Sequence, residues 1–306
     1  MILALSGGVG GAKLVQGLAA HVPATTLAIV VNTGDDFDHF GLHISPDVDT
    51  VMYTLAGLAS LDRGWGLQDE TWSAMEMFGR YGAETWFNLG DLDLATNILR
   101  TEALRQGHPL SAVTDDLRRR LGVAVRIIPM TDDSVATYVD TPLGKLHFQE
   151  YFVRERCAPD VLGIELRGLA DARPSPPLRE ALAEADAIIV TPSNPIVSVG
   201  PILGVPGVRD ALRQSRAHRV AVTPLIEGQA VKGPTVAMMR WAGLEPNAVS
   251  VAGLYRDFLD TFVLDERDAA LRPQIEALGL RVHVTDTLMT TAEDKARLAG
   301  EILGRL

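Results

Sequence analysis

The chain begins with residues 1–13, MILALSGGVGGAK, in which an apolar run leads directly into a glycine-rich turn. Such a run, followed by glycines and then by an amphipathic segment over residues 14–19, is typical of a buried strand that turns into a helix. Glycines let backbone N–H groups approach a phosphate at a helix N-terminus, so the turn indicates a phosphate or nucleotide contact. The opening stretch therefore predicts an α/β fold with a ligand site beside its first strand.

The turn differs from two common nucleotide-binding motifs. Ala12 stands where a Walker A loop has the glycine before its lysine, and Leu14 replaces the Ser or Thr that would bind magnesium. Lys13 occupies the place of the third glycine of the dinucleotide fingerprint, which disfavours an NAD-dependent oxidoreductase. The alternative interpretation of the same glycines is a tight strand–helix turn without a ligand.

Apolar runs rich in β-branched residues recur along the chain and alternate with amphipathic segments. The predicted strands are residues 2–5, 27–31, 123–128, 187–191, 220–223, 249–252 and 282–285. Helices are predicted over residues 177–185, 206–214, 234–242 and 292–303. This alternation indicates βαβ units in a doubly wound, mostly parallel, Rossmann-like sheet.

Residues 48–121 depart from this alternation. Helical patterns follow one another there, over residues 48–61, 70–81, 92–106 and 111–121, without an obvious strand. We expect a helical insertion that forms a smaller cap over one side of the sheet, within a single α/β domain spanning residues 1–306. A hairpin formed by residues 135–140 and 145–149 is expected at the sheet margin.

Composition restricts the partners of the protein. The formal net charge is −11, whereas a nucleic-acid partner requires clustered Lys and Arg. No run approaches the roughly 20 apolar residues of a membrane span, and we expect no signal peptide. The single cysteine, Cys157, fits a reducing cytoplasm. We expect a cytoplasmic protein that binds small molecules, neither nucleic acid nor membrane, with a homodimer as an assembly that the sequence permits.

Acidic residues gather after the second predicted strand and at the start of the following helix. Asp35 and Asp36 directly follow that strand, and Asp47 and Asp49 come soon after. Mg²⁺ usually takes one or two carboxylates and completes its shell with water and substrate phosphates, so we interpret Asp35 and Asp36 as metal ligands. Turn formation and helix capping are the alternative interpretation of these acids.

Polar residues follow two further predicted strands, at residues 131–133 and 191–195, and turn chemistry alone can account for them. The carboxyl ends of parallel strands nevertheless form the ligand-binding edge of an open sheet. We therefore predict that residues 6–13, 32–38, 131–133 and 191–195 converge on one cleft, roofed by the helical insertion.

Several stretches together resemble one family. They are residues 7–13 (GGVGGAK), 45–51 (SPDVDTV), 89–91 (LGD), 129–133 (PMTDD), 193–195 (SNP) and 286–289 (DTLM). In this order they resemble the 2-phospho-L-lactate transferase family of coenzyme F420 biosynthesis, from the N-terminus to about residue 290. The length of the match makes it more specific than any one motif.

The resemblance implies an in-line phosphoryl displacement. The terminal ribityl hydroxyl of the deazaflavin Fo attacks the phosphate of a GDP-linked three-carbon acid, GMP leaves, and Mg²⁺ is required. The donor carries phospholactate in archaeal members of the family and phosphoenolpyruvate in many bacterial ones, and the sequence leaves this choice open. Positioning and electrostatic stabilisation supply most of the rate in such reactions.

Carried over position by position, the resemblance also assigns roles. Asp49 is the catalytic aspartate near the Fo hydroxyl and the metal, so the predicted metal ligands are Asp49, Asp35 and Asp36. Asn88 and Asp91 join Asp49 on the Fo side. The residues assigned to the donor nucleotide are Gly7, Gly8, Gly10, Gly11, Lys13, Ser193, Asn194 and Pro195.

The stretch around residues 88–97 departs from the family pattern. Leu92 replaces the usual arginine, Asn97 replaces the usual histidine, and Asn88 occupies a position that is often basic. These changes bear on the contacts to the donor and the acceptor. The acidic scaffold is intact.

A nucleotide-sugar-binding regulatory protein of the related superfamily is the alternative function. Such proteins typically carry a Ser-Asp-Asp-Gly-Gly-Ser-Ser-Gly stretch after the second strand. Here residues 32–37 read Asn-Thr-Gly-Asp-Asp-Phe, which favours the transferase.

Overall fold

The computed structural model describes residues 1–60, 63–231 and 233–306. A seven-stranded parallel sheet lies at its centre. In chain order the strands are β1 (Ile2–Ser6), β2 (Leu27–Val31), β5 (Arg126–Pro129), β9 (Ala187–Val190), β10 (His218–Val222), β13 (Thr261–Asp265) and β14 (Arg281–Thr285). In space they follow the order β14-β13-β10-β9-β1-β2-β5. The predicted doubly wound, Rossmann-like sheet is confirmed.

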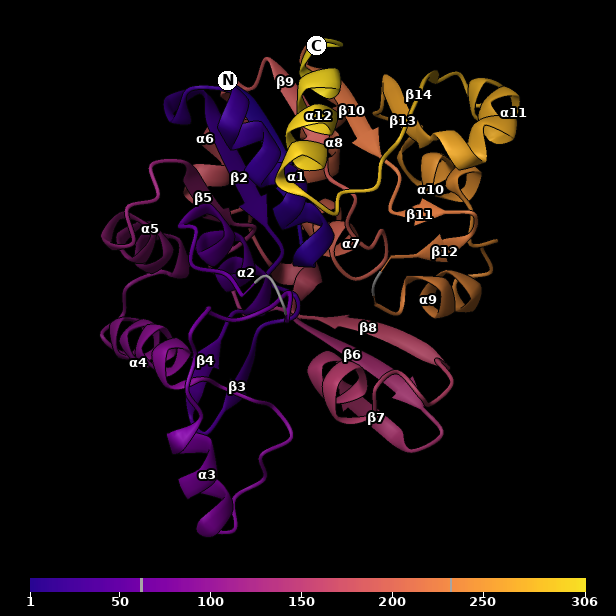
Figure 1. Ribbon diagram of the computed structural model, residues 1–306. Helices are drawn as coiled ribbons and strands as arrows, with labels where there is room; N and C mark the ends of the chain where they lie inside the picture. Colours follow the sequence, from indigo (N-terminus) through magenta and orange to yellow (C-terminus); the bar gives the residue numbers. More distant parts are fainter. Residues whose placement is uncertain (61–62, 232) are drawn as a thin grey trace.

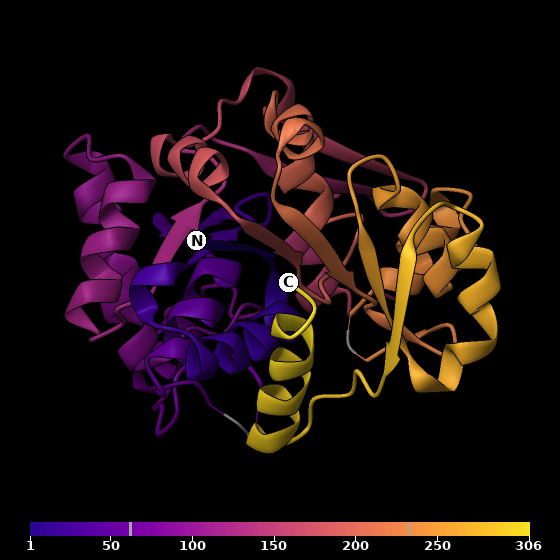
Figure 2. The ribbon, with the colours of Figure 1, turned by 90° about the horizontal axis from the view of Figure 1, so that it is seen from above.

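Helices cover both faces of this sheet (Figures 1 and 2). The helices of the described residues are α1 (Gly8–His21), α2 (Pro46–Leu55), α3 (Ser73–Arg80), α4 (Asp91–Arg105), α5 (Leu110–Arg120), α6 (Pro176–Glu184), α7 (Val199–Gly204), α8 (Val208–Gln214), α9 (Thr235–Trp241), α10 (Ala248–Tyr255), α11 (Arg272–Glu276) and α12 (Ala292–Leu303). The described residues include no helix that is both long and apolar enough to cross a membrane.

The central strands are buried on both sides, and alternate side chains enter two different cores. Leu3 and Leu5 pack into a core with residues of α6, α7, α8 and α10. Ala4, between them, packs into a second core with residues of α1, α2, α5 and α12. Successive side chains of a strand point to opposite faces, so an uninterrupted apolar run is what a strand between two helical layers needs.

Within residues 48–121, α3 and α4 reach away from the sheet (Figure 1). α2 and α5 contribute to the second core, whereas α3 lies farthest from the sheet. A small separate core holds this part together, with Ile44, Met75, Leu89 and Leu94 at its centre. The helix predicted over residues 48–61 ends at Leu55, and residue 61 lies outside the described residues.

Three small antiparallel sheets complete the fold. β3 (Phe37–His39) pairs with β4 (Leu42–Ile44), and β11 (Leu225–Ile226) pairs with β12 (Gln229–Ala230). The predicted hairpin is present as β6 (Ala136–Thr141) and β7 (Gly144–His147). It does not extend the central sheet, however. Instead, β6 also pairs with β8 (Gly163–Arg167), which makes a separate three-stranded sheet. Sequence analysis missed β8.

One predicted strand is wrong. Residues 249–252 lie inside α10, where the side chain of Asn247 caps the helix by accepting a hydrogen bond from the N–H of Ser250 at 2.9 Å. The strand that occupies this place in the sheet is β13, a little further along the chain. A short apolar run fits a buried helix turn as well as a buried strand, so the hydrophobic pattern could not distinguish them.

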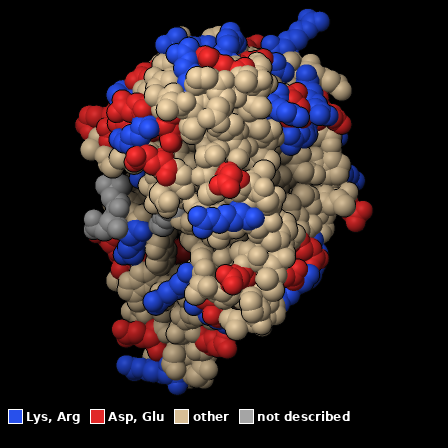
Figure 3. Space-filling model, turned by 90° about the vertical axis from the view of Figure 1, so that its right-hand side faces the viewer, with Lys and Arg blue, Asp and Glu red and all other residues tan. Residues whose placement is uncertain are grey.

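Basic and acidic side chains are interspersed on the face drawn in Figure 3, with broad stretches of other residues between them. Outside the grey residues, this face carries both signs of charge without segregation.

Candidate functional site

A cavity of about 520 Å³ lies at the carboxyl edge of the central sheet, beside β1 and β9. The strand order reverses between these neighbours: the chain passes through β2 and β5 on one side and through β10, β13 and β14 on the other. Open α/β sheets bind ligands at such a switch point. The volume falls within the range of small-molecule sites, roughly 300–1,000 Å³.

Most of the predicted site residues line this cavity. They are Gly7, Gly8, Gly10, Lys13, Asp35, Asp49, Asn88, Ser193 and Asn194. Gly11, Asp36, Asp91 and Pro195 do not line it. Of the four polar strand ends that we expected in one cleft, the one after β5 lies elsewhere: Asp132 and Asp133 line a second cavity of about 560 Å³.

Two glycines of the turn are required by backbone packing. A Cβ atom on Gly10 would lie 2.5 Å from the carbonyl oxygen of Pro192, and one on Gly11 would lie 2.3 Å from Oγ of Ser6. Gly8 differs, because its φ is +64° and the nearest atom to a Cβ there would be a carboxylate oxygen of Asp47 at 3.8 Å. Gly10 and Gly11 therefore let the turn approach the loop after β9, and Gly8 permits the left-handed backbone conformation.

The loop after β9 is tied to the turn by its side chains. Ser193 Oγ accepts a hydrogen bond from the N–H of Gly7 at 3.1 Å and donates to the Gly7 carbonyl at 2.7 Å. Asn194 Oδ1 accepts from the N–H of Ile196 at 2.9 Å. These bonds fix the shape of the cavity wall.

Asp35 and Asp47 are buried carboxylates on the cavity wall. Burial, with repulsion from Asp47 and Asp36, raises the pKa of Asp35 well above its usual value. Burial also raises the pKa of Asp47 to about 6, although Asn32 Nδ2 donates to its Oδ2 at 3.0 Å and Gly8 N–H donates to it as well. Both shifts show that negative charge here lacks enough compensation.

Asp49 has a cationic partner. The guanidinium of Arg100 donates from Nη2 to Asp49 Oδ1 and from Nη1 to Asn97 Oδ1, the latter at 2.8 Å. Arg100 is almost completely buried, and its Nε has no hydrogen-bond partner among the described residues. Burial raises the pKa of the Asp49 carboxyl, and the Arg100 charge opposes that rise.

Asp93 is a further carboxylate on the cavity wall. Its Oδ1 accepts a hydrogen bond from the hydroxyl of Tyr53 at 2.7 Å. Burial and repulsion from Asp49 raise the pKa of Asp93 to about 7. The Asp93 carboxyl is therefore easier to protonate than a carboxyl in water.

Asp36 lines the second cavity instead of the first. Its Oδ2 accepts from Ser45 Oγ at 2.8 Å and lies 3.2 Å from His43 Nε2. Its Oδ1 is buried and has no hydrogen-bond partner among the described residues.

Asp91 holds the start of α3. Its Oδ2 accepts from the N–H of Ser73, its Oδ1 accepts from the N–H of Ala74, both at 3.0 Å, and the Thr71 hydroxyl donates to it at 2.6 Å. These bonds are those of a helix cap. The geometry does not bring Asp91 to the cavity.

Sequence analysis missed several residues of the wall. Asp47 was counted among the clustered acids without an assigned role, with helix capping as the alternative, and Asp93 was given no role. Their positions carry a signal: Asp47 shares the first turn of α2 with Asp49, and Asp93 follows Asp91 in α4. Arg100 gives no such signal, because its partner Asp49 is far away in sequence.

A parallel sheet with a ligand-sized cavity at its switch point, a glycine-rich turn and buried carboxylates defines a Rossmann-like α/β protein suited to a phosphorylated ligand. Sequence comparison makes the assignment specific. The chain belongs to the 2-phospho-L-lactate transferase CofD family, whose model it matches over residues 2–297. The resemblance noted in the sequence is confirmed.

Named relatives align along nearly the whole chain. A 2-phospho-L-lactate transferase of Methanosarcina barkeri is 40% identical over 303 residues, covering 99% of this chain and 97% of the relative. A phosphoenolpyruvate transferase of Kitasatospora aureofaciens is 42% identical over 305 residues, covering 97% and 95%.

Comparison of structures supports the fold alone. The crystal structure of a UPF0052 family member from Bacillus halodurans shares the fold with a TM-score of 0.61 at 17% identity. It covers 99% of this chain and 98% of that chain.

Proposed function

We propose that the protein transfers a phospholactyl or phosphoenolpyruvyl group from a GDP-linked donor to the ribityl hydroxyl of the deazaflavin Fo, with release of GMP, in coenzyme F420 biosynthesis. Membership of the transferase family over residues 2–297 carries this proposal. The relatives named as 2-phospho-L-lactate and phosphoenolpyruvate transferases support the two donor acids equally.

The donor diphosphate would lie at the start of α1. The glycine-rich turn lines the cavity there, and Lys13 adds an ammonium group to the same wall. Backbone N–H groups at a helix N-terminus and one lysine are sufficient to hold a phosphorylated ligand. An overall charge of −11 is compatible with such a local site.

The residues that fit a magnesium ion best are Asp35 and Asp47. Asp35 Oδ1 is buried and has no hydrogen-bond partner in the described part of the chain. Within that part, no group of three or more His, Cys, Asp or Glu is arranged to hold a metal by itself. Two carboxylates are nevertheless enough for Mg²⁺, whose remaining ligands are commonly water and substrate phosphates. A bound Mg²⁺ would supply charge neutralisation for the phosphate under attack.

This assignment differs from the sequence-based one. Asp49 is neutralised by Arg100, and Asp36 is bonded to Ser45. Asp49 has a cationic partner, and Asp36 lines the second cavity instead of the first, so we assign both lower priority as direct ligands.

Asp49 would act on the acceptor. The ribityl oxygen forms the new bond to phosphorus while the bond from phosphorus to the GMP oxygen breaks. The hydroxyl proton passes to the Asp49 carboxylate, which Arg100 holds at the cavity wall. A positioned carboxylate typically contributes about 10²–10⁴-fold to such a transfer.

The test is product analysis by mass spectrometry. Purified protein is incubated with Fo, Mg²⁺ and either GDP-linked phospholactate or GDP-linked phosphoenolpyruvate. We expect a phosphodiester of Fo and one equivalent of GMP from at least one donor, and no product when EDTA removes Mg²⁺. Failure of both donors, together with a thermal shift on adding a UDP-sugar, would support the regulatory alternative instead.

A further inference from the structure

Residues 286–291 connect the last strand to the last helix and cross the molecule at the cavity. We call them the crossover segment. It leaves β14 at one edge of the sheet and reaches α12, which packs beside α1 (Figure 2). Thr287, Leu288 and Met289 line the cavity on the way. The DTLM motif lies in this segment, and the transfer reaction assigns it no role.

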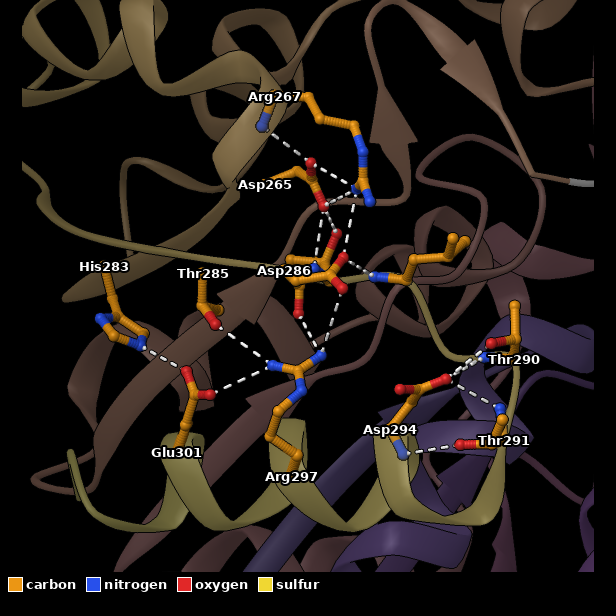
Figure 4. Close-up of polar contacts among 12 residues, drawn as sticks. Asp265, Arg267, His283, Thr285, Asp286, Thr290, Thr291, Asp294, Arg297 and Glu301 are labelled. Carbon is orange, nitrogen blue, oxygen red and sulfur yellow. Dashed lines mark hydrogen bonds and ion pairs between the residues drawn. The ribbon is translucent and has the colours of Figure 1, made fainter.

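A fully buried carboxylate fixes the start of the crossover segment (Figure 4). Asp265, the last residue of β13, accepts from the N–H of Thr287 at 2.8 Å and from its hydroxyl at 2.7 Å. The other side of the same carboxylate accepts from the Arg267 N–H at 3.0 Å and from its guanidinium at 2.8 Å. Charge-assisted bonds of this number leave Thr287 little freedom.

The end of the crossover segment is fixed independently. Asp294 in α12 accepts from the N–H of Thr290 at 3.0 Å and from the N–H of Thr291 at 2.9 Å, and the Thr291 hydroxyl caps the helix in return. Arg297 of the same helix also reaches the start of the segment, where its Nη2 donates to the Asp286 carbonyl at 2.7 Å. Figure 4 shows these contacts on both sides of the segment. The residues between the two fixed ends are Leu288 and Met289.

The fixed segment holds the one lysine that the glycine-rich turn brings to the cavity. Lys13 Nζ donates to the Met289 carbonyl at 2.8 Å. The Met289 side chain itself is buried in the core that contains α1 and α12. An ammonium has three donors, and within the described residues Lys13 Nζ forms no ion pair. Its remaining donors are therefore available to an anion in the cavity.

We propose that Asp265 and Thr287 are positioning residues for a diphosphate subsite: through the Met289 carbonyl they place the Lys13 ammonium against the diphosphate of the donor. This inference rests on the proposed function, and it gives the DTLM motif a role in donor binding. Neither Asp265 nor the Thr287 hydroxyl needs to touch the ligand. Loss of their bonds should weaken binding of the diphosphate and leave the chemical step unchanged.

The experiment compares two substitutions at one position. Thr287→Val removes the hydroxyl at constant shape, and Thr287→Ser keeps it. Asp265→Asn removes the charge that holds the segment. Asp260→Asn is the matched control, because Asp260 lies just before the other end of β13, away from the cavity, and binds Arg219 in a comparable way at 2.8 Å. Isothermal titration calorimetry at fixed Mg²⁺ measures the affinity of each variant for inorganic diphosphate and for GDP.

We expect Thr287→Val and Asp265→Asn to weaken both ligands by about tenfold or more, the scale of one charge-assisted hydrogen bond. Thr287→Ser and Asp260→Asn should bind as the wild type does. In turnover assays the donor KM should rise while kcat and the KM for Fo stay constant, because Lys13 would touch the diphosphate before and during transfer.

Unchanged affinity in Thr287→Val, or an equal loss in Asp260→Asn, would overturn the inference. The proposed function fails in a different way. A wild type that binds diphosphate but not GDP would refute the nucleotide donor, yet leave the subsite standing if Thr287→Val weakens diphosphate. A wild type that binds neither would refute both.

Discussion

Asp49 and Arg100 form a buried ion pair at the cavity wall, so neither side chain can be changed alone without leaving the other charge unpaired. This complicates the simplest test of Asp49. Asp49→Asn keeps the shape of the side chain but leaves a buried guanidinium without a counterion. A loss of turnover in that variant alone could reflect instability instead of lost chemistry.

A double substitution separates the two effects. Arg100→Met should lower the free energy of unfolding by roughly 3–5 kcal/mol, because it leaves the Asp49 carboxylate buried and unpaired. Asp49→Leu combined with Arg100→Met should recover most of this stability, since an apolar pair replaces the ion pair. Urea denaturation of the single and double variants measures both values.

Turnover should behave differently from stability in the same variants. The double variant should remain at least about 10²-fold slower than the wild type, because no carboxylate is left to accept the Fo proton. Recovery of turnover together with stability would reduce Asp49 to a structural partner of Arg100.

The glycines illustrate what sequence could and could not predict about single residues. The turn and its place after the first strand were predictable, because glycine spacing is local. The reason for Gly10 was not: its missing Cβ faces Pro192, which comes from a loop nearly two hundred residues away in sequence. Gly10→Val would therefore disturb the packing of two loops, and a loss of donor binding in it would not isolate a ligand contact. Arg100 was not predictable for a similar reason, because its partner Asp49 is 51 residues away in sequence.

At the scale of elements, Asp91 links two helices of the insertion. It lies in the first turn of α4 but accepts hydrogen bonds from the first residues of α3. Its place in the family motif fits an Fo contact, whereas its geometry fits a cap. The two roles predict different results for one substitution.

Asp91→Ala should loosen α3 and lower the free energy of unfolding, because the first N–H groups of that helix lose their acceptor. Limited proteolysis should then cut faster between residues 70 and 90, while the affinity for GDP stays unchanged. Asp91→Asn keeps one acceptor oxygen, so it should lose less stability and less protection from proteolysis than Asp91→Ala. Intact protection of this region together with a large rise in the KM for Fo would instead support direct Fo binding.

Helices and strands were predictable where the hydrophobic pattern extends over many residues or where capping residues define the ends of the element. The helix over residues 292–303 was predicted with its bounds from its amphipathic pattern, and in the structure Thr291 and Asp294 form a capping box at its start. Residues 249–252, Val-Ser-Val-Ala, were misassigned because four residues are too few to define a period, and their conformation depends on the cap at Asn247 and on packing in the core. β8 was missed because its side chains are only partly buried.

For the molecule as a whole, the switch point between β1 and β9 concentrates uncompensated acids in one place. The alternation of strands and helices predicted a parallel sheet, and a parallel sheet predicts where its ligand edge lies. It does not predict which strand ends reach the cavity. That depends on where the following loop runs. Both β5 and β14 are edge strands, but the segment after β14 lines the cavity, whereas Asp132 after β5 caps α5 by accepting from the N–H of Ser111 at 2.7 Å.

The buried acids should make the stability of the ligand-free protein depend on pH, and Asp93 provides the clearest measurement. Its pKa rises from 3.8 to about 7 on folding, so between these values the folded state holds a proton that the unfolded state has lost. Stability therefore falls as pH rises through this window, by at most about 1.4 kcal/mol per pH unit for one proton.

The Asn side chain of Asp93→Asn cannot ionise, so this variant should lose the pH-dependent component. The free energy of unfolding of the wild type should therefore fall relative to that of Asp93→Asn from pH 5 to 7. Asp91→Asn is the control, because the pKa of Asp91 is lowered on folding and both of its states are ionised in this range. Urea denaturation at several pH values measures the difference, and parallel curves for wild type and Asp93→Asn would show that Asp93 is ionised in the folded protein.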